Sequence, residues 1–419
     1  MKTMNRWWVV VGALIIQISL GAVYIWSVFQ TPLKTAFPSW TETQVTLPAQ
    51  IVLAVFALAV IFGGRIQDRI GPRRVATAGG LILGLGLMLA SLTGRLADRA
   101  ALYWLLLTYA VLGGAGIGAA YVCPIATCVK WFPDKRGLIT GLAVAGFGAG
   151  AFFFAPLARG LIGGTPYSLF GANLFALPRL GVFNTFFALG AIFLVAVVGG
   201  AQWLRNPPPG YVPEGWTPPT PAPGAAAAKV DYGPKEMLAQ PAFWLLWVTY
   251  LVGCTAGLMV IMKTSPIWQS FRLGALPSPI SAEDFKAAGT AGAMAVSILA
   301  IFNSLGRILW GRISDRIGRK ASLVAMFFLC GVALLALDWL RTYALFLIGI
   351  CAVGLCFGGY LAMYPAVTAD FFGTKHIGIN YGWMFSAYGV GGWLGPWLAA
   401  RLMRVADSVP YLTEAGEQK

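Results

Sequence analysis

Residues 64–74 read GRIQDRIGPRR and residues 311–320 read GRISDRIGRK, so one short pattern occurs twice, 247 positions apart. A second pair of segments, WFPDKRGLITGLAVAGFGAG at 131–150 and FFGTKHIGINYGWMFSAYGVGG at 371–392, aligns at an offset of about 241. Two pairs of matching segments at nearly one offset indicate an internal repeat. The chain is therefore expected to fold as two similar halves.

The composition of the chain indicates that both halves lie in a membrane. Of its 419 residues 58% are hydrophobic and 11% are charged, whereas about a quarter of the residues of a soluble domain are charged. Apolar runs of about 20 residues, the length that crosses hydrocarbon as a helix, recur along the chain. We predict an all-α membrane protein with eleven spans, at approximately 7–30, 45–65, 75–93, 101–129, 138–160, 182–204, 241–268, 285–310, 320–340, 343–369 and 378–403.

The expected spans divide into two helix bundles. Six of them form an N-terminal bundle within residues 1–204, and five form a C-terminal bundle within residues 241–404. Residues 205–240 are rich in Pro, Gly and Ala and lack hydrophobic periodicity, which is typical of a flexible linker. The repeat predicts a partner for the sixth span after residue 404, yet residues 405–419 read as a polar tail.

The loops differ in their content of Lys and Arg, which sets the orientation. Basic residues are concentrated in the loops after even-numbered spans, and such loops stay in the cytoplasm. The N-terminus is then cytoplasmic, and we expect a monomeric, multi-pass protein of the inner membrane. The net charge of +15 reflects this topology, and the bases are too dispersed for nucleic-acid binding. The inner-loop bases include Arg65, Arg69, Arg73, Arg74, Lys130, Lys135, Arg136, Arg205, Lys229, Lys235, Arg312, Arg316, Arg319, Lys320 and Lys375.

The repeated pattern G-R-I-x-D-R-I-G-x-R/K resembles the cytoplasmic loop signature of the major facilitator superfamily. The segment at 131–150 resembles the fifth-span entry of monocarboxylate transporters and bacterial oxalate:formate antiporters, and GAVYIWSVF at 21–29 is similar to the first helix of those antiporters. The resemblance implies two pseudo-symmetric bundles around a substrate path near the bilayer midplane. It also implies twelve spans, whereas eleven are visible in this sequence.

Charged residues of the two motifs are candidates for a conformational role. Aspartates 68 and 315 sit among basic residues where helix ends meet, so they can bridge neighbouring helices in one conformation. The resemblance implies that these charges act in alternating access, and anchoring of the topology is the other interpretation. The candidate gating residues are Asp68, Arg69, Arg73, Asp315, Arg316 and Arg319.

One arginine, Arg307, lies inside the eighth apolar span. A charge within a span costs at least a few kcal/mol and usually faces the bundle interior. Arginine is the natural bidentate ligand of a carboxylate, and Asn303 lies four residues earlier on the same helix face. Snorkelling of Arg307 to the inner surface is the alternative. The resemblance implies that Arg307 holds the carboxylate of the substrate.

Aromatic residues of the spans extend this candidate site. A buried tyrosine needs a partner for its hydroxyl, and a carboxylate is a suitable one, although packing and interfacial positions remain open for each ring. The resemblance places two of them, Tyr360 and Tyr388, at substrate-facing positions. The candidate substrate-binding residues are Arg307, Asn303, Tyr388, Tyr360, Tyr121, Tyr24, Phe385 and Tyr364.

The residue types favour a monoanionic substrate. Oxalate antiporters of this group carry a lysine at the place of Tyr388, and Arg307 alone suits one carboxylate. We expect a secondary transporter of small monocarboxylates, such as lactate or pyruvate. Two alternative functions remain open: an oxalate:formate-type antiporter and a transporter-like carboxylate sensor. Proton-coupled relatives carry an aspartate where Asn303 stands, so a proton would travel with the substrate or on a water beside Arg307.

Enzymatic and ATP-driven functions find no support in the motifs. The glycine-rich stretches are membrane helices without a following Walker-type lysine, which excludes a nucleotide-phosphate loop. The six cysteines fall in spans without metal-ligand spacing and are interpreted as small apolar residues. We therefore expect no enzymatic activity, no metal and no cofactor.

Overall fold

The computed structural model describes residues 5–169, 172–213, 215–216, 231–276 and 281–402. Part of the expected linker and the whole of the expected tail, 405–419, lie outside these residues. The N-terminal half contains α1 (Trp7–Leu20), η1 (Gly21–Ile25), α2 (Trp26–Ala36), α3 (Glu42–Ile70), α4 (Pro72–Ala90), η2 (Ser91–Arg95), α5 (Asp98–Leu105), η3 (Leu106–Leu112), α6 (Gly113–Trp131), α7 (Arg136–Gly163) and α8 (Gly181–Ala201).

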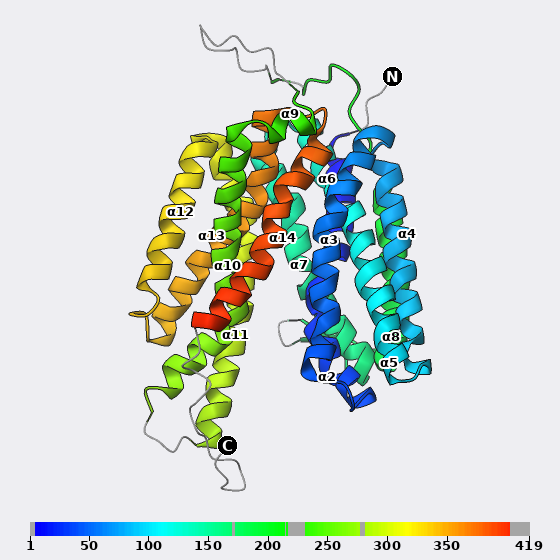
Figure 1. Ribbon diagram of the computed structural model, residues 1–419, viewed down its shortest axis with the longest axis vertical. Coiled ribbons are helices and arrows are strands. Elements are labelled where there is room, and N and C mark those ends of the chain that lie inside the picture. The colour runs from blue at the N-terminus through cyan, green and yellow to red at the C-terminus, as the bar shows by residue number, and fades with distance from the viewer. Residues whose placement is uncertain (1–4, 170–171, 214, 217–230, 277–280, 403–419) are drawn as a thin grey trace.

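The C-terminal half begins after a short helix, α9 (Pro234–Leu238). Its long helices are α10 (Pro241–Leu273), α11 (Ala282–Ile317), α12 (Arg319–Ala336), α13 (Tyr343–Phe372) and α14 (Ile377–Leu402). The expected all-α arrangement in two bundles is confirmed, with α1–α8 on one side and α10–α14 on the other (Figure 1).

Ten helices of the described residues are long and apolar enough to span a membrane. The eleventh expected span, α14, has 26 residues but is not among them. Its composition is less apolar because it carries Asn380, Ser386, two tyrosines and many glycines. Large apolar side chains on the bundle perimeter, such as Val195, Phe328 and Leu335, are at least 70% exposed and suit contact with lipid.

The first and fourth spans are not continuous α-helices. A 3-10 segment, η1, separates α1 from α2, and a π-helical segment, η3, separates α5 from α6. Such segments redirect the side chains that follow them and are frequent at functional sites. Here η1 carries Tyr24, one of the candidate site residues.

Each repeated motif ends one helix and starts the next with a single glycine. Gly71 between α3 and α4 has φ 93°, and Gly318 between α11 and α12 has φ 88°. Residues with a side chain rarely adopt such backbone angles, so the motif requires glycine at this point. The two turns lie at the same end of the molecule, which we call the motif face (Figure 1).

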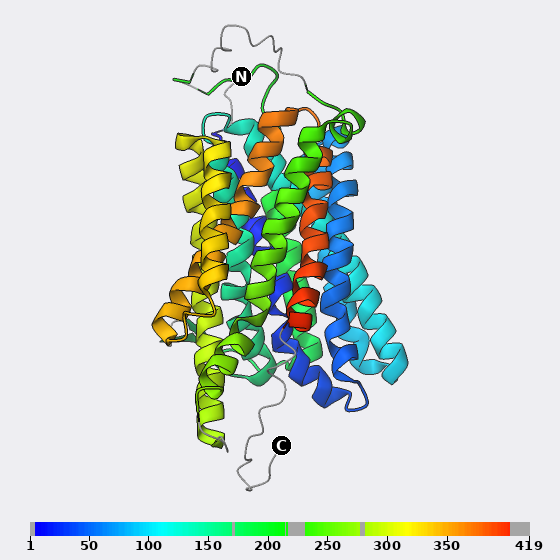
Figure 2. The same ribbon diagram turned by 60° about the vertical axis from the view of Figure 1, so that its left-hand side comes forward.

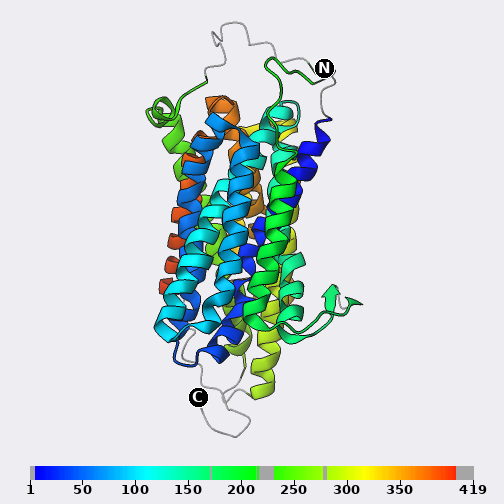
Figure 3. The ribbon, with the colours of Figure 1, turned by 90° about the vertical axis from the view of Figure 1, so that its right-hand side faces the viewer.

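A small hairpin departs from the all-helical expectation. Strands β1 (Tyr167–Leu169) and β2 (Ala172–Phe175) pair antiparallel between α7 and α8. Figure 3 shows the hairpin standing out from the side of the N-terminal bundle. It lies at the end opposite the motif face and does not contribute to the site described below.

Candidate substrate-binding site

The guanidinium of Arg307 projects from α11 toward the other bundle. Its Nη1 donates a hydrogen bond of 2.6 Å to the carbonyl oxygen of Val144 on α7, and its Nε lies 3.4 Å from Oδ1 of Asn303. The residue is 1% exposed. Val144 lies eight residues into α7, which at 1.5 Å per residue is about 12 Å from the start of that helix. The cation is therefore held inside the molecule, between the bundles.

Glycine at position 148 makes room for this cation on α7. A Cβ atom built on Gly148 would lie 3.1 Å from Cζ and 3.2 Å from Nη1 of Arg307. These distances are shorter than ordinary van der Waals contact, so the guanidinium packs directly on bare backbone. The bundles approach closely here because α7 has no side chain at position 148.

No carboxylate of the described residues neutralises Arg307. None of the ion pairs among the described residues involves Arg307. Among the buried polar side chains of these residues, Arg307 is the one that belongs to a Lys, Arg, Asp or Glu residue. Arginine has five N–H donors in a planar fork, and the two contacts above leave the rest of the fork available. Chemically, this arrangement is suited to receive an anion.

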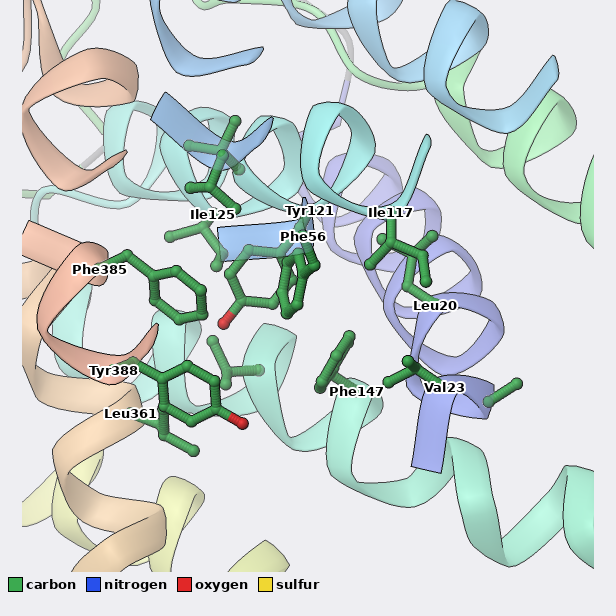
Figure 4. Close-up of a cluster of buried hydrophobic side chains, with 14 of the residues drawn as sticks. Leu20, Val23, Phe56, Ile117, Tyr121, Ile125, Phe147, Leu361, Phe385 and Tyr388 are labelled. Atoms are coloured by element: carbon green, nitrogen blue, oxygen red, sulfur yellow. The ribbon is translucent and has the colours of Figure 1, made fainter. Parts of the chain in front are cut away.

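Aromatic side chains from both bundles form a cluster around Phe147, the residue that precedes Gly148 on α7. The hydroxyl oxygens of Tyr24 (η1) and Tyr388 (α14) lie 2.9 Å apart, and Phe385 stacks on Tyr388 at 4.9 Å between ring centroids. Tyr121 (α6) contacts Phe385 at 5.1 Å and Phe147 (α7) at 5.2 Å. In Figure 4 Tyr121 and Phe147 face Phe385 and Tyr388 across this cluster. The candidate site is thus a polar and aromatic cluster formed jointly by the two halves.

Sequence reasoning did not select three residues that the structure adds to the cluster. Phe56 (α3) lies 5.1 Å from Tyr121 and 5.5 Å from Phe385, and Phe147 lies 5.4 Å from Tyr24. Among 26 phenylalanines no local signal distinguishes these two. Gln17 donates to the carbonyl oxygen of Tyr121 at 3.2 Å, and its Oε1 has no hydrogen-bond partner among the described residues. A lone glutamine within an apolar span was the available signal.

Two of the candidate tyrosines make their contacts within the C-terminal bundle. Tyr364 donates to Oγ1 of Thr249 at 2.8 Å and stacks on Tyr250 at 4.0 Å. Tyr360 stacks on Phe327 of α12 at 4.8 Å. Among the described residues, Arg307 contacts Asn303, and hydroxyl or ring contacts link Tyr24, Tyr121, Phe385 and Tyr388. Neither Tyr360 nor Tyr364 has a hydrogen bond or ring contact with any of these six residues there.

At the motif face, two aspartates join the bundles in a pseudo-symmetric manner. Asp315 of α11 accepts hydrogen bonds from the backbone N–H groups of Gly137 and Leu138, at 2.9 and 2.8 Å. Asp68 of α3 accepts hydrogen bonds from Gly378 and Ile379, at 3.1 and 2.9 Å. Each carboxylate thereby caps the first turn of a helix in the opposite half, where unpaired N–H groups and the helix dipole favour a negative charge.

Ion pairs reinforce one of these two contacts more than the other. Arg319 pairs with Asp315 at 2.8 Å and with Asp370 at 2.9 Å, and Arg136 reaches Asp370 from the other half at 2.5 Å. On the side of Asp68 the corresponding contact is Lys130, at 4.0 Å. The Asp315 contact is therefore expected to be the stronger one.

The remaining candidate gating residues have different surroundings. Nε of Arg73 donates to Oε1 of Gln202 at 2.8 Å, within the N-terminal half. Arg69 and Arg316 are exposed at the motif face, and neither has an ion pair within the described residues. Within the same residues, no group of three or more His, Cys, Asp or Glu side chains could hold a metal ion.

The family model described as Major Facilitator Superfamily matches residues 4–274 and 270–409. The chain is 30% identical to the uncharacterized MFS-type transporter YhjX of Escherichia coli (strain K12), over 92% of this chain and 86% of that protein. It is 27% identical to the oxalate:formate antiporter of Oxalobacter formigenes, over 95% and 85%. It is 26% identical to human monocarboxylate transporter 12, over 96% and 76%.

Proposed function

We propose that this chain, which belongs to the Major Facilitator Superfamily, is a secondary active transporter of small monocarboxylates such as lactate or pyruvate. The observation that carries the proposal is the buried cation of Arg307, whose hydrogen bonds go to the neutral oxygens of Val144 and Asn303. A buried charge without a counter-charge is costly. A substrate carboxylate supplies that charge and fits the planar fork of arginine.

The contributions of both bundles support transport by alternating access. Arg307 and Tyr388 come from one half, and Tyr24 and Tyr121 come from the other, so relative motion of the halves rearranges the site. The contacts of Asp68 and Asp315 join the halves at the motif face. In the proposed cycle these contacts break when the substrate passes to that side.

The chemistry of the cluster favours a monoanion. Arg307 is the one buried cation of the described residues, and the polar groups of the candidate site are neutral hydroxyls and an amide. One guanidinium balances one carboxylate, whereas a dianion would leave a second negative charge without a partner in a buried site. The name of the human relative, a monocarboxylate transporter, agrees with this choice.

Exchange of oxalate-like and formate-like anions is the second candidate function. It is favoured by the similarity to the Oxalobacter formigenes protein, which extends over 95% of this chain. A carboxylate sensor that binds without transport is a third candidate, from another functional class. The same site would serve all three, so a transport measurement is needed to separate them.

We also propose that a proton accompanies the substrate and that the motif face lies in the cytoplasm. The half-buried Asn303 beside Arg307 offers no ionisable proton carrier, so the proton would travel with the substrate or on a water. The cytoplasmic assignment rests on the Lys and Arg residues gathered at the motif face. A monomer of the inner membrane is the simplest assembly consistent with this function.

Counterflow in proteoliposomes tests the proposal. Vesicles loaded with unlabelled lactate should accumulate labelled lactate and pyruvate when they contain the wild-type protein, and a pH-indicator dye should report a co-transported proton. Oxalate should compete weakly. Accumulation of oxalate or formate instead would identify the antiporter, and specific binding without accumulation of any label would identify the sensor.

A further inference from the structure

A groove of about 710 Å³ opens at the motif face where the two bundles meet. Its walls are α3 of the N-terminal half and, from the C-terminal half, α9, the loop before α14 and the first turns of α14. Figure 1 shows α3 and α14 side by side here with α9 close to their ends, and α3 and α14 remain adjacent in Figure 2. A volume of this size is in the range of pockets that bind small ligands.

One end of the groove is cationic. Arg65 and Arg69 from α3 and Lys235 and Lys375 from the other half line it, and all four are exposed. None of their side chains makes an ion pair or hydrogen bond with another described residue. His376 also lines the groove.

The nearby carboxylates accept hydrogen bonds from backbone N–H groups, and among the described residues none of them forms an ion pair with these four cations. Asp68, which lines the groove, accepts from Gly378 and Ile379. Asp231 accepts from the backbone of Thr374 and Lys375, and Glu236 accepts from the backbone of Gly233. The four cations outnumber the three carboxylates, so this end of the groove carries an excess of positive charge.

The other end of the groove is apolar. Leu58 and Phe62 line it and are 60% and 65% exposed, with Ile61 and Trp383 beside them. From Arg69 to Leu58 the helix covers eleven residues, or about 16 Å. The groove thus passes from a cationic mouth at the motif face to an apolar wall within the membrane-spanning part of α3.

We infer that this groove binds one anionic phospholipid, with its phosphate at the cationic end and an acyl chain along Leu58, Phe62 and Trp383. A free phosphate would satisfy the cations alone, and the adjoining apolar wall is what favours a lipid. Basic clusters beside spans attract the anionic lipids of the inner leaflet. Because Arg65 and Arg69 belong to one half and Lys235 and Lys375 to the other, the bound lipid bridges the halves and stabilises the capped contact of Asp68 with α14.

The test is a titration of the delipidated, detergent-solubilised protein with phosphatidylglycerol or phosphatidylcholine, followed by native mass spectrometry. The wild-type protein should retain one phosphatidylglycerol at least about tenfold more tightly than phosphatidylcholine. The variant Arg65→Gln/Lys235→Gln/Lys375→Gln should lose this preference. A control of equal charge change outside the groove, Arg205→Gln/Arg312→Gln/Lys320→Gln, should keep it, and equal thermal unfolding of all three proteins would show that they are folded.

Three results would overturn the inference. The first is wild-type retention of phosphatidylglycerol by the groove variant. The second is equal affinity of the wild-type protein for both lipids. The third is displacement of phosphatidylglycerol by an equimolar amount of glycerol 3-phosphate, which carries the phosphate without acyl chains and would indicate a free-anion site.

Discussion

The Nη1 atom of Arg307 lies 2.6 Å from the carbonyl oxygen of Val144, so a buried cation of the C-terminal bundle is held by the backbone of the N-terminal bundle. This contact joins α11 to α7 in the interior of the molecule, well away from the aspartate contacts at the motif face. When a substrate carboxylate binds, the guanidinium of Arg307 would exchange a neutral acceptor, the carbonyl oxygen of Val144, for a charged one. Charge-assisted hydrogen bonds are roughly twice as strong as neutral ones, which provides the free energy for that exchange.

The substitution Gly148→Ala tests the close packing of the guanidinium on α7. The added methyl group would lie 3.1 Å from Cζ of Arg307, so the side chain must move. Crowding of this kind costs about 1–3 kcal/mol, and we expect KM for lactate to rise by roughly tenfold. Uptake at varied lactate concentrations measures the change.

Gly331→Ala is the matched control for that substitution, because a Cβ atom at Gly331 on α12 meets no atom within 4 Å. This variant should transport like the wild type. If both variants behave alike, the contact between Gly148 and the guanidinium has no part in substrate binding.

The substitution Tyr388→Lys tests the basis of anion selectivity. It places a second cation in the cluster, beside Tyr24 and Phe385. Two cations suit a dianion, so oxalate should compete with labelled lactate more strongly, by about tenfold or more, as expected for one added charge-assisted contact. Competition curves for oxalate, formate and lactate measure the shift.

The variant Tyr388→Phe controls for loss of the Tyr24 hydroxyl contact without added charge. It should leave the preference for lactate over oxalate in place. An unchanged oxalate competition curve in the lysine variant would contradict the assignment of Tyr388 to the substrate pocket.

Removal of the two aspartate caps should loosen the motif face unequally. Asp315→Asn weakens hydrogen bonds to Gly137 and Leu138 and also the ion pair with Arg319, whereas Asp68→Asn weakens those to Gly378 and Ile379. Hydrogen bonds to charged groups contribute about 1.5–3 kcal/mol each. The population of molecules whose halves are separated at the motif face should therefore rise severalfold or more in both variants, and it should rise more in Asp315→Asn than in Asp68→Asn. Distances between spin labels at the motif face, measured by double electron–electron resonance, report that population.

Asp338→Asn serves as the control for the two cap variants. Asp338 forms an exposed pair with Arg341, away from the contacts between the halves, and exposed pairs contribute little. The distance distribution should be that of the wild type. An order of effects in which Asp68→Asn opens the face more than Asp315→Asn would refute the ranking of the two contacts.

The repeat predicted much of the fold, because its chemistry is local. An aspartate and a glycine at fixed positions of G-R-I-x-D-R-I-G specify a helix end and a one-residue turn, which the structure shows at Gly71 and at Gly318. The partners of the aspartates could not be read in the same way. They are backbone N–H groups of α7 and α14, and no side chain in the sequence marks them.

The site was less accessible to sequence reasoning than the fold. Arg307 stood out because a cation within an apolar span requires an explanation, but Val144 and Gly148, which receive it, are ordinary apolar positions of a distant helix. The contacts of Tyr360 and Tyr364 within the C-terminal bundle could not be read from the sequence, because a span surrounded by lipid and by other helices is apolar on every side. Hydrophobic periodicity then does not indicate how the helix is rotated about its own axis. Only packing determines which of its faces meets the other half.

The most direct test of the central claim is the binding of labelled pyruvate to purified protein in a scintillation proximity assay, comparing wild type, Arg307→Lys and Arg312→Lys. Lysine at 307 keeps the charge but loses the planar fork, and we expect affinity to fall by about tenfold or more. Arg312 is exposed on the same helix, and its variant should bind pyruvate like the wild type. Equal affinity of the Arg307→Lys variant and the wild type would contradict the claim that the guanidinium of Arg307 holds the substrate carboxylate.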